Sequence, residues 1–155
     1  MLVTIMKTFI VCFSYHHKNT DKIASVFAKT LDAEVKMPGE VSPQGFSEYD
    51  LVGFGSGISF GKHYKVLLDF AEKLPAVTKK KAFIFSTSGQ TGKTSKFHQK
   101  LREALESKGF SIVGDFNCAG FDTYGVLKIV GGIQKGHPDE ADLKNAEIFA
   151  KGLIS

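Results

Sequence analysis

The chain has 155 residues, and 43% of them are hydrophobic, which is enough for one buried core and too few for two domains of ordinary size. We therefore expect a single domain over residues 1–155. The formal charge of +4 comes from basic residues scattered among acidic ones, with one lysine run at 79–81, a pattern atypical of nucleic-acid-binding proteins.

The cellular compartment is indicated by the N-terminal segment and by the two cysteines. The apolar segment MLVTIMKTFIVCF is too short to cross a bilayer and has no signal cleavage site, so we expect no membrane insertion. Cys12 falls inside an expected strand and Cys118 lies far along the chain, which favours reduced thiols over a disulfide framework. The sequence therefore predicts a cytoplasmic protein.

Short apolar runs alternate along the chain with segments whose apolar residues recur every third or fourth position. In chain order, we expect a strand at 8–13, a helix at 21–31, strands at 33–36 and 51–55, a helix at 64–74, a strand at 82–85, a helix at 95–108, a strand at 111–116 and a helix at 139–153. The strands are apolar on both faces, as in a parallel sheet covered by helices on both sides. The pattern predicts an α/β fold, a three-layer doubly wound sandwich around a five-stranded parallel sheet.

The candidate binding site lies in the loops that follow three of these strands. In a doubly wound sheet, ligands bind beyond the carboxyl ends of the strands. The segments after the first, third and fourth strands read SYHHKNTDK, GSGISFGKHY and STSGQTGKTS, and all three are polar.

The first loop leads into a helix N-terminus, whose free backbone N–H groups favour an anion. Its side chains add hydroxyl, amide and imidazole donors suited to a phosphate group: Ser14, His16, His17, Asn19 and Thr20. Two other interpretations stay open. In the first interpretation, Thr20 is an ordinary helix N-cap and the two histidines are exposed loop residues. In the second, which is less favoured, His16 and His17 bind a metal, although no Cys, Asp or Glu has ligand spacing nearby.

The second loop has glycines at positions 55, 57 and 61, which allow the backbone to approach a flat ligand closely. Phe60 offers an aromatic wall, and His63 and Tyr64 extend this aromatic rim. The alternative is a flexible loop whose Phe60 side chain packs into the core.

The third loop resembles a Walker A nucleotide-binding motif at Gly92-Lys93-Thr94. The first glycine of that motif is replaced by Thr87, so a nucleotide triphosphatase is disfavoured. Ser88 and Gly89 are better suited as backbone donors to the polar edge of a ring.

Taken together, the three loops resemble those of the flavodoxin family. The flavodoxin phosphate loop, Ser-x-Thr-Gly-Asn-Thr, is approximated by Ser14, Asn19 and Thr20, in a loop that is one residue longer and lacks the glycine. The resemblance covers nearly the whole chain, including the segments GSGISFGKHYKVLLDF, AFIFSTSG and GFDTYGVLKIVGGIQKGHPDEADLKNAEIFAKGL. It implies a flavodoxin-like sheet with the strand order 2-1-3-4-5.

The resemblance also implies that the chain binds FMN without covalent attachment. The phosphate would be held by Ser14, His16, His17, Asn19 and Thr20. The isoalloxazine would be flanked by residues of the second and third loops: Ser56, Gly57, Ile58, Ser59, Phe60, Gly61, Thr87, Ser88 and Gly89. The carbonyl near Gly57 is the family's candidate for accepting a hydrogen bond from N5 of the reduced flavin.

Three features depart from the family. Familiar flavodoxins are acidic, whereas this chain is basic. The third loop has no aromatic residue between Ser86 and Ser95 to stack on the outer face of the flavin, and the acidic residues common there are missing. Phe121 or Tyr124 could instead cover that edge of the flavin. Ordinary packing of these two rings within the protein is an equally favoured interpretation.

The function that the resemblance implies is electron transfer, in which FMN cycles between oxidised, semiquinone and hydroquinone states. The expected partners are redox proteins, and the expected state is a monomer or weak dimer. The alternative is an FMN-dependent reductase of quinones or other small acceptors that uses NAD(P)H. A flavin-free binding module is a third class, disfavoured because Ser14 and Gly55-Ser56 stand where a phospho-receiver needs acidic residues.

Overall fold

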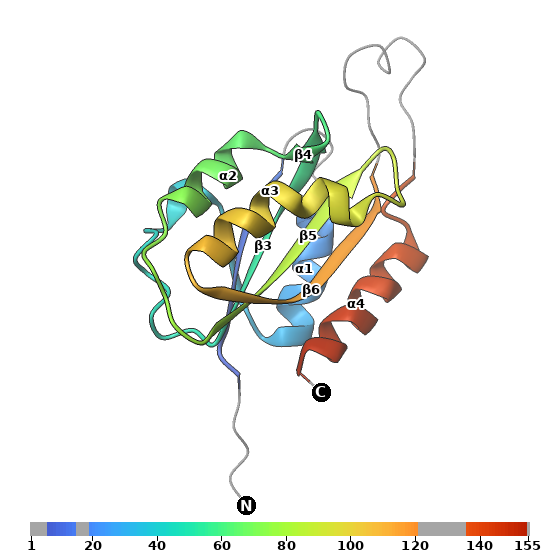
Figure 1. Ribbon diagram of the computed structural model, residues 1–155. Coiled ribbons are helices and arrows are strands. Elements are labelled where there is room, and N and C mark those ends of the chain that lie inside the picture. Colours follow the sequence, from blue (N-terminus) through green and yellow to red (C-terminus); the bar gives the residue numbers. More distant parts are fainter. Residues whose placement is uncertain (1–5, 15–18, 121–135, 155) are drawn as a thin grey trace, which may run out of the picture.

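The computed structural model describes residues 6–14, 19–120 and 136–154. In chain order its elements are β1 (Thr8–Phe13), α1 (Asn19–Leu31), β2 (Glu34–Lys36), the short 3₁₀ helix η1 (Pro38–Glu40), β3 (Leu51–Ser59), β4 (Lys62–His63), α2 (Lys65–Glu72), β5 (Lys80–Ser88), α3 (Thr94–Ser107), β6 (Phe110–Ala119) and α4 (Glu140–Ile154). They form three layers, with the sheet between α1 and α4 on one face and α2 and α3 on the other (Figure 1).

Five parallel strands lie in the order β2-β1-β3-β5-β6. This is the predicted order when the parallel strands are numbered alone, so the predicted fold class is confirmed. The addition is β4, a two-residue strand that pairs antiparallel with the end of β3. A strand this short leaves no apolar run in the sequence, and the prediction missed it.

Three strands extend past their predicted ends: β3 runs to Ser59, β5 to Ser88 and β6 to Ala119. Residues 56–59 and 86–88, expected in loops, therefore lie in strands. The ladder continues through polar positions, where Gly57 is the register partner of Thr87. Apolar composition marks where side chains enter the core, whereas the backbone hydrogen bonds of a strand continue beyond that point.

The sheet separates two apolar cores, because successive strand residues point to opposite faces. Phe9 of β1 belongs to the core under α2 and α3, and its neighbour Ile10 belongs to the core under α1 and α4. At the centre of the second core, the ring of Phe27 packs edge-on against three phenylalanines at centroid distances of 5.0 to 5.6 Å: Phe83, Phe85 and Phe116. Edge-to-face aromatic packing at these distances is favourable and orients the helix on the sheet.

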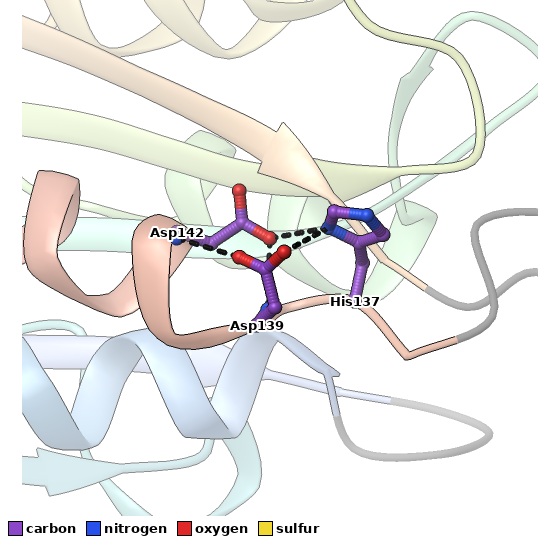
Figure 2. Close-up of side chains that lie close together, drawn as sticks. All are labelled: His137, Asp139 and Asp142. Carbon is purple, nitrogen blue, oxygen red and sulfur yellow. Dashed lines mark hydrogen bonds and ion pairs between the residues drawn. The ribbon is translucent and has the colours of Figure 1, made fainter.

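Helix α4 begins with a reciprocal pair of capping hydrogen bonds (Figure 2). The Asp142 N–H donates to Asp139 Oδ1 at 3.0 Å, and the Asp139 N–H donates to Asp142 Oδ2 at 2.9 Å. His137 Nδ1 lies 2.6 Å from Asp142 Oδ2, and this hydrogen bond raises the pKa of His137. The three side chains fix the start of α4 one residue after its predicted start. None of the helices in the described part of the chain has the length and apolar character that a bilayer crossing requires.

Candidate functional site

The carboxyl ends of β1, β3 and β5 meet at one edge of the sheet, as the prediction requires (Figure 1). Phe13 is in register with Ser56, and Ser56 is in register with Ser86. The structure therefore brings together at this edge the predicted residues of all three loops, apart from His16 and His17, which lie outside the described residues.

The N-terminus of α1 is tied to the end of β5. The hydroxyl oxygens of Thr20 and Thr87 lie 2.8 Å apart, and both side chains are buried. Asn19 is also buried, and it packs against Gly120, where an added Cβ would lie 2.9 Å from Asn19 Nδ2. Because α1 begins at Asn19, Thr20 lies inside the first turn and is not the N-cap. These contacts hold the positive end of the α1 dipole at the carboxyl edge of the sheet.

Thr87 also bears on the Walker A interpretation. The motif requires a glycine at this position, in a loop that wraps around phosphate groups. Here Thr87 lies within β5 and its side chain is engaged by Thr20. The structure therefore offers no Walker A loop among these residues.

The second loop is a β-hairpin made of β3 and β4. Its two-residue turn has positive φ at Phe60 (53°) and Gly61 (78°), as in a type I′ turn. Glycine adopts this conformation freely, but phenylalanine rarely does, so the hairpin holds Phe60 in an uncommon backbone conformation. The Phe60 side chain is 83% exposed, which rules out the alternative that it packs into the core.

The base of the hairpin is closed around Ser56. The Tyr64 N–H donates to Ser56 Oγ at 3.1 Å, and the Ser56 hydroxyl donates to the carbonyl oxygen of Gly57 at 2.7 Å. The Tyr64 side chain lies directly against Gly57, where an added Cβ would lie 2.7 Å from the Tyr64 hydroxyl oxygen. Gly57 therefore leaves the space that the Tyr64 side chain occupies.

His63 was expected on the aromatic rim, but this prediction is wrong: the side chain is 1% exposed. Alternation along β4 leaves Lys62 exposed and turns His63 into the protein, where its Nε2–H donates to the Phe85 carbonyl oxygen at 3.0 Å. Burial lowers the pKa of His63 to about 3, so the ring is neutral at neutral pH. It lies against the ring of His98, with the centroids 4.9 Å apart. His63 anchors the hairpin in the protein instead of facing a ligand.

The turn after β5 is fixed by Ser88. Its hydroxyl donates to the Gln90 carbonyl oxygen at 2.5 Å, and its carbonyl oxygen accepts a hydrogen bond from the Gly120 N–H at 3.0 Å. Gly89 is buried, whereas Gln90 and the residues up to Lys93 are exposed. The backbone at 88–90 is therefore held in place at the edge where the three loops meet.

Comparison with known families agrees with this arrangement. A model of the flavodoxin domain matches residues 10–124, which span β1 through β6 and include all three loops. The chain belongs to the flavodoxin family. An uncharacterized protein from Methanocaldococcus jannaschii is 50% identical over 149 residues, which cover 96% of this chain and 99% of that protein.

Solved flavodoxins share the fold at low sequence identity. Flavodoxin 2 from Bacillus cereus superposes with a TM-score of 0.71 at 18% identity, covering 96% of this chain and 97% of that one. A flavodoxin from Streptococcus pneumoniae gives a TM-score of 0.69 at 19% identity, covering 95% and 97%. A flavodoxin from the domain Archaea gives 0.66 at 14%, covering 96% of each chain. This flavodoxin-family chain thus keeps the family's architecture nearly end to end.

The sequence analysis missed a polar cluster behind the site, in which Ser86 and His98 are fully buried and Asp115 and Asn117 are half-buried. Ser86 Oγ lies 2.7 Å from His98 Nε2, and His98 Nδ1 lies 2.7 Å from Asp115 Oδ2. Arg102 pairs with the other Asp115 oxygen, Oδ1. Burial raises the pKa of Asp115, but hydrogen bonds from His98 and Arg102 outweigh it and lower the pKa below its usual value.

This cluster reaches the turn after β5 through Asn117. The Asn117 amide nitrogen donates to Ser86 Oγ at 2.8 Å and to Ser88 Oγ at 3.1 Å. A signal was present in the sequence, since Asp115 and Asn117 alternate with apolar neighbours in β6, and the polar run Ser86-Thr87-Ser88 ends the apolar stretch of β5. We call Ser88, Asn117, Ser86, His98 and Asp115 the buried relay.

Proposed function

We propose that this flavodoxin-family protein binds FMN at the carboxyl edge of the sheet and transfers electrons between redox partner proteins. The observation that carries the proposal is the convergence of the α1 N-terminus, the β3–β4 hairpin and the Ser88–Gln90 turn on one edge. Flavodoxin-family proteins bind a flavin, typically FMN, which supports this choice of cofactor. We further propose one domain over residues 1–155, a cytoplasmic location, and a monomer or weak dimer.

The phosphate would be held at the start of α1. The first turn of a helix presents free N–H groups and a positive partial charge, which suit a phosphate. Ser14 follows β1 directly and adds a hydroxyl, while Asn19 and Thr20 lie in the first turn. His16 and His17 are proposed as further donors.

The flavin ring would lie between the hairpin and the turn after β5. On one side are the predicted residues of β3 and its turn: Ser56, Gly57, Ile58, Ser59, Phe60 and Gly61. On the other side are Thr87, Ser88 and Gly89, whose backbone is fixed by the Ser88 hydrogen bonds. A bound flavin supplies the electron chemistry, and the protein supplies position and electrostatics. We propose that Phe60 covers the ring and that the peptide at Gly57 faces its central nitrogen.

The charge at this edge indicates the kind of partner. Lys62 on the hairpin and Lys93 and Lys96 at the start of α3 are exposed, and we call them the basic rim. Within the described residues, none of the three lies in an ion pair. The sequence has no acidic residue between Asp50 and Asp69 or between Glu72 and Glu103, the segments that form this rim. We therefore propose an acidic redox protein as partner.

The first test is FMN binding by an Asn19→Ala/Thr20→Ala double variant. We expect its affinity for FMN to fall at least about tenfold, or about 1.4 kcal/mol, because the variant removes the proposed Asn19 donor and the Thr20–Thr87 contact that holds the helix start at this edge. Dissociation constants would be measured by quenching of FMN fluorescence. Thr30→Ala is the matched control, because the Thr30 hydroxyl donates to the Val26 carbonyl oxygen in the last turn of the same helix, at the end opposite the proposed phosphate site.

Equal affinities in the double variant and the wild type would show that the phosphate lies elsewhere. The absorption spectrum during anaerobic reduction separates the two candidate activities. Reduction in one-electron steps by a redox protein supports the carrier. Rapid direct reduction of the bound flavin by NAD(P)H supports the reductase.

A further inference from the structure

The buried relay has the order serine, histidine, aspartate, but it is not a hydrolytic triad. Ser86 and His98 are each 0% exposed, so the Ser86 hydroxyl is closed to any substrate. The chain of contacts instead joins two places: the Arg102–Asp115 pair, which is partly exposed, and the Ser88–Gln90 turn at the proposed flavin edge. Its role therefore has to be sought in the turn.

The chemistry of the groups gives each hydrogen bond a direction. Arginine only donates and an ionised carboxylate only accepts, so Asp115 accepts from both Arg102 and His98. When the His98 ring carries a single proton, that proton lies on Nδ1, and Nε2 accepts from the Ser86 hydroxyl. Because that hydroxyl is committed to His98, its oxygen accepts from the Asn117 amide.

The direction continues to the turn. The Asn117 amide also donates to Ser88 Oγ, which leaves the Ser88 proton for the Gln90 carbonyl oxygen. Five groups in sequence are thus each satisfied in one orientation only. A reversed proton on His98 would make Nε2 a donor, and the Ser86 proton would lose its acceptor in the relay. Buried polar groups without partners are costly, so such a change is transmitted to neighbouring groups.

We propose that His98 is a positioning residue, which sets the conformation of the Ser88–Gln90 turn, and thereby the flavin site, through the direction of the relay. The part that concerns the flavin rests on the proposed function. His63 supports the arrangement, because its ring packs on His98 from β4. Burial keeps the pKa of His63 low and its ring neutral, so it places no positive charge beside His98. The groups that face His98 are Ser86, Asp115 and His63, with Arg102 behind Asp115.

Asp115→Asn tests the direction of the relay. Arg102 can only donate, so the new amide presents its oxygen to Arg102 and its nitrogen to His98. His98 Nδ1 must then accept, and the ring proton moves to Nε2. Asp69→Asn on the surface of α2 is the matched control, because it also replaces an aspartate and removes one negative charge.

The readouts are the ¹⁵N shifts of the His98 ring, the amide signals of residues 88–90 in the FMN-free protein, the dissociation constant for FMN and the flavin midpoint potential. For Asp115→Asn we expect the ring proton on Nε2, shifted turn signals, FMN binding weaker by about tenfold, and a changed potential. Asp69→Asn should match the wild type in the His98 ring shifts, the turn signals and the dissociation constant for FMN. Ser86→Ala is a second variant, which cuts the relay between His98 and Asn117 and should move the same turn signals.

Several results would overturn the proposal. One is a wild-type His98 with its proton on Nε2. Another is an Asp115→Asn protein in which the proton moves while the turn signals and FMN affinity equal those of Asp69→Asn. If Asp115→Asn does not fold, turn signals in Ser86→Ala that equal the wild type overturn it. If the wild type binds no FMN, the proposed function fails, but the FMN-free protein still decides the relay: turn signals that shift in Asp115→Asn or Ser86→Ala support it, and unshifted ones refute it.

Discussion

Two glycines of β3 lie under phenylalanine rings of the neighbouring strand. A Cβ added at Gly53 would lie 2.3 Å from Phe83, and one added at Gly55 would lie 2.2 Å from Phe85. Both phenylalanines are fully buried, and each packs against Phe27. The glycines therefore make room for the aromatic core that holds α1, and through α1 the proposed phosphate site.

Gly53→Ala should destabilise the protein by about 1–3 kcal/mol, because the Phe83 ring cannot move without disturbing its packed neighbours. Urea unfolding monitored by circular dichroism measures the change. Gly39→Ala is the control, since no atom lies within 4 Å of its added Cβ, and its stability should stay within about 1 kcal/mol of the wild type. Equal stabilities in the two variants would mean that the β3–β5 contact adapts at little cost.

At the level of the element, the buried side chain of His63 anchors the β3–β4 hairpin in the protein. Its pKa is about 3 in the folded protein and about 6.5 in the unfolded chain. Between these values only the unfolded chain binds the proton, so stability rises with pH across the window and falls as the solution is acidified from about 6.5 towards 3. His137 acts with the opposite sign, because its raised pKa adds stability in acid that is lost as pH rises through the folded value.

We expect His63→Phe to reduce this loss of stability in acid. The variant keeps a ring but binds no proton, so its slope should be smaller by up to about 1.4 kcal/mol per pH unit between pH 6 and 4. Its stability at pH 7.5 should be lower than that of the wild type, because the hydrogen bond to the Phe85 carbonyl is lost. Urea unfolding at pH 7.5, 6 and 4 gives the comparison. The same acid slope in both proteins would contradict the assignment of the acid effect to His63.

The elements also show what the sequence could predict. Strand β1 was predicted with its observed bounds, because all its residues are apolar or are threonine. The ends of β3 and β5 were not, because Ser56, Thr87 and Ser88 look like loop residues until their hydrogen-bond partners are known. The polar positions of the relay were visible in the sequence, but their contacts were not, because Ser86, His98 and Asp115 lie on three different elements. His63 was misplaced because nothing in the sequence marks a two-residue strand that turns it inward.

At the scale of the whole molecule, the basic rim lies beside the proposed flavin site, while Asp21, Glu140 and Asp142 add negative charge at the starts of α1 and α4. The basic rim lies on the hairpin and at the start of α3, at the edge where the parallel strands end (Figure 1). At the opposite edge, Lys7 pairs with Glu48 and its backbone N–H donates to Asp50, whereas Lys73 and Lys81 are exposed and lie in no ion pair among the described residues. If the proposed function holds, an acidic partner that docks on the basic rim would bring its redox centre close to the proposed flavin site.

This predicts how the rate of electron transfer depends on salt. A reduced acidic ferredoxin should reduce the FMN-loaded protein fastest at low ionic strength, with the rate falling at least about tenfold as salt screens the attraction over a Debye length of about 10 Å at 0.1 M. A Lys62→Glu/Lys93→Glu/Lys96→Glu variant should lose this dependence. The triple variant Lys7→Glu/Lys73→Glu/Lys81→Glu changes the net charge by the same amount at the opposite edge of the sheet. This variant should keep most of the salt dependence of the wild-type rate. If both variants slow equally, net charge and not the basic rim steers the partner; a wild-type rate that rises with salt would exclude an acidic partner at this edge.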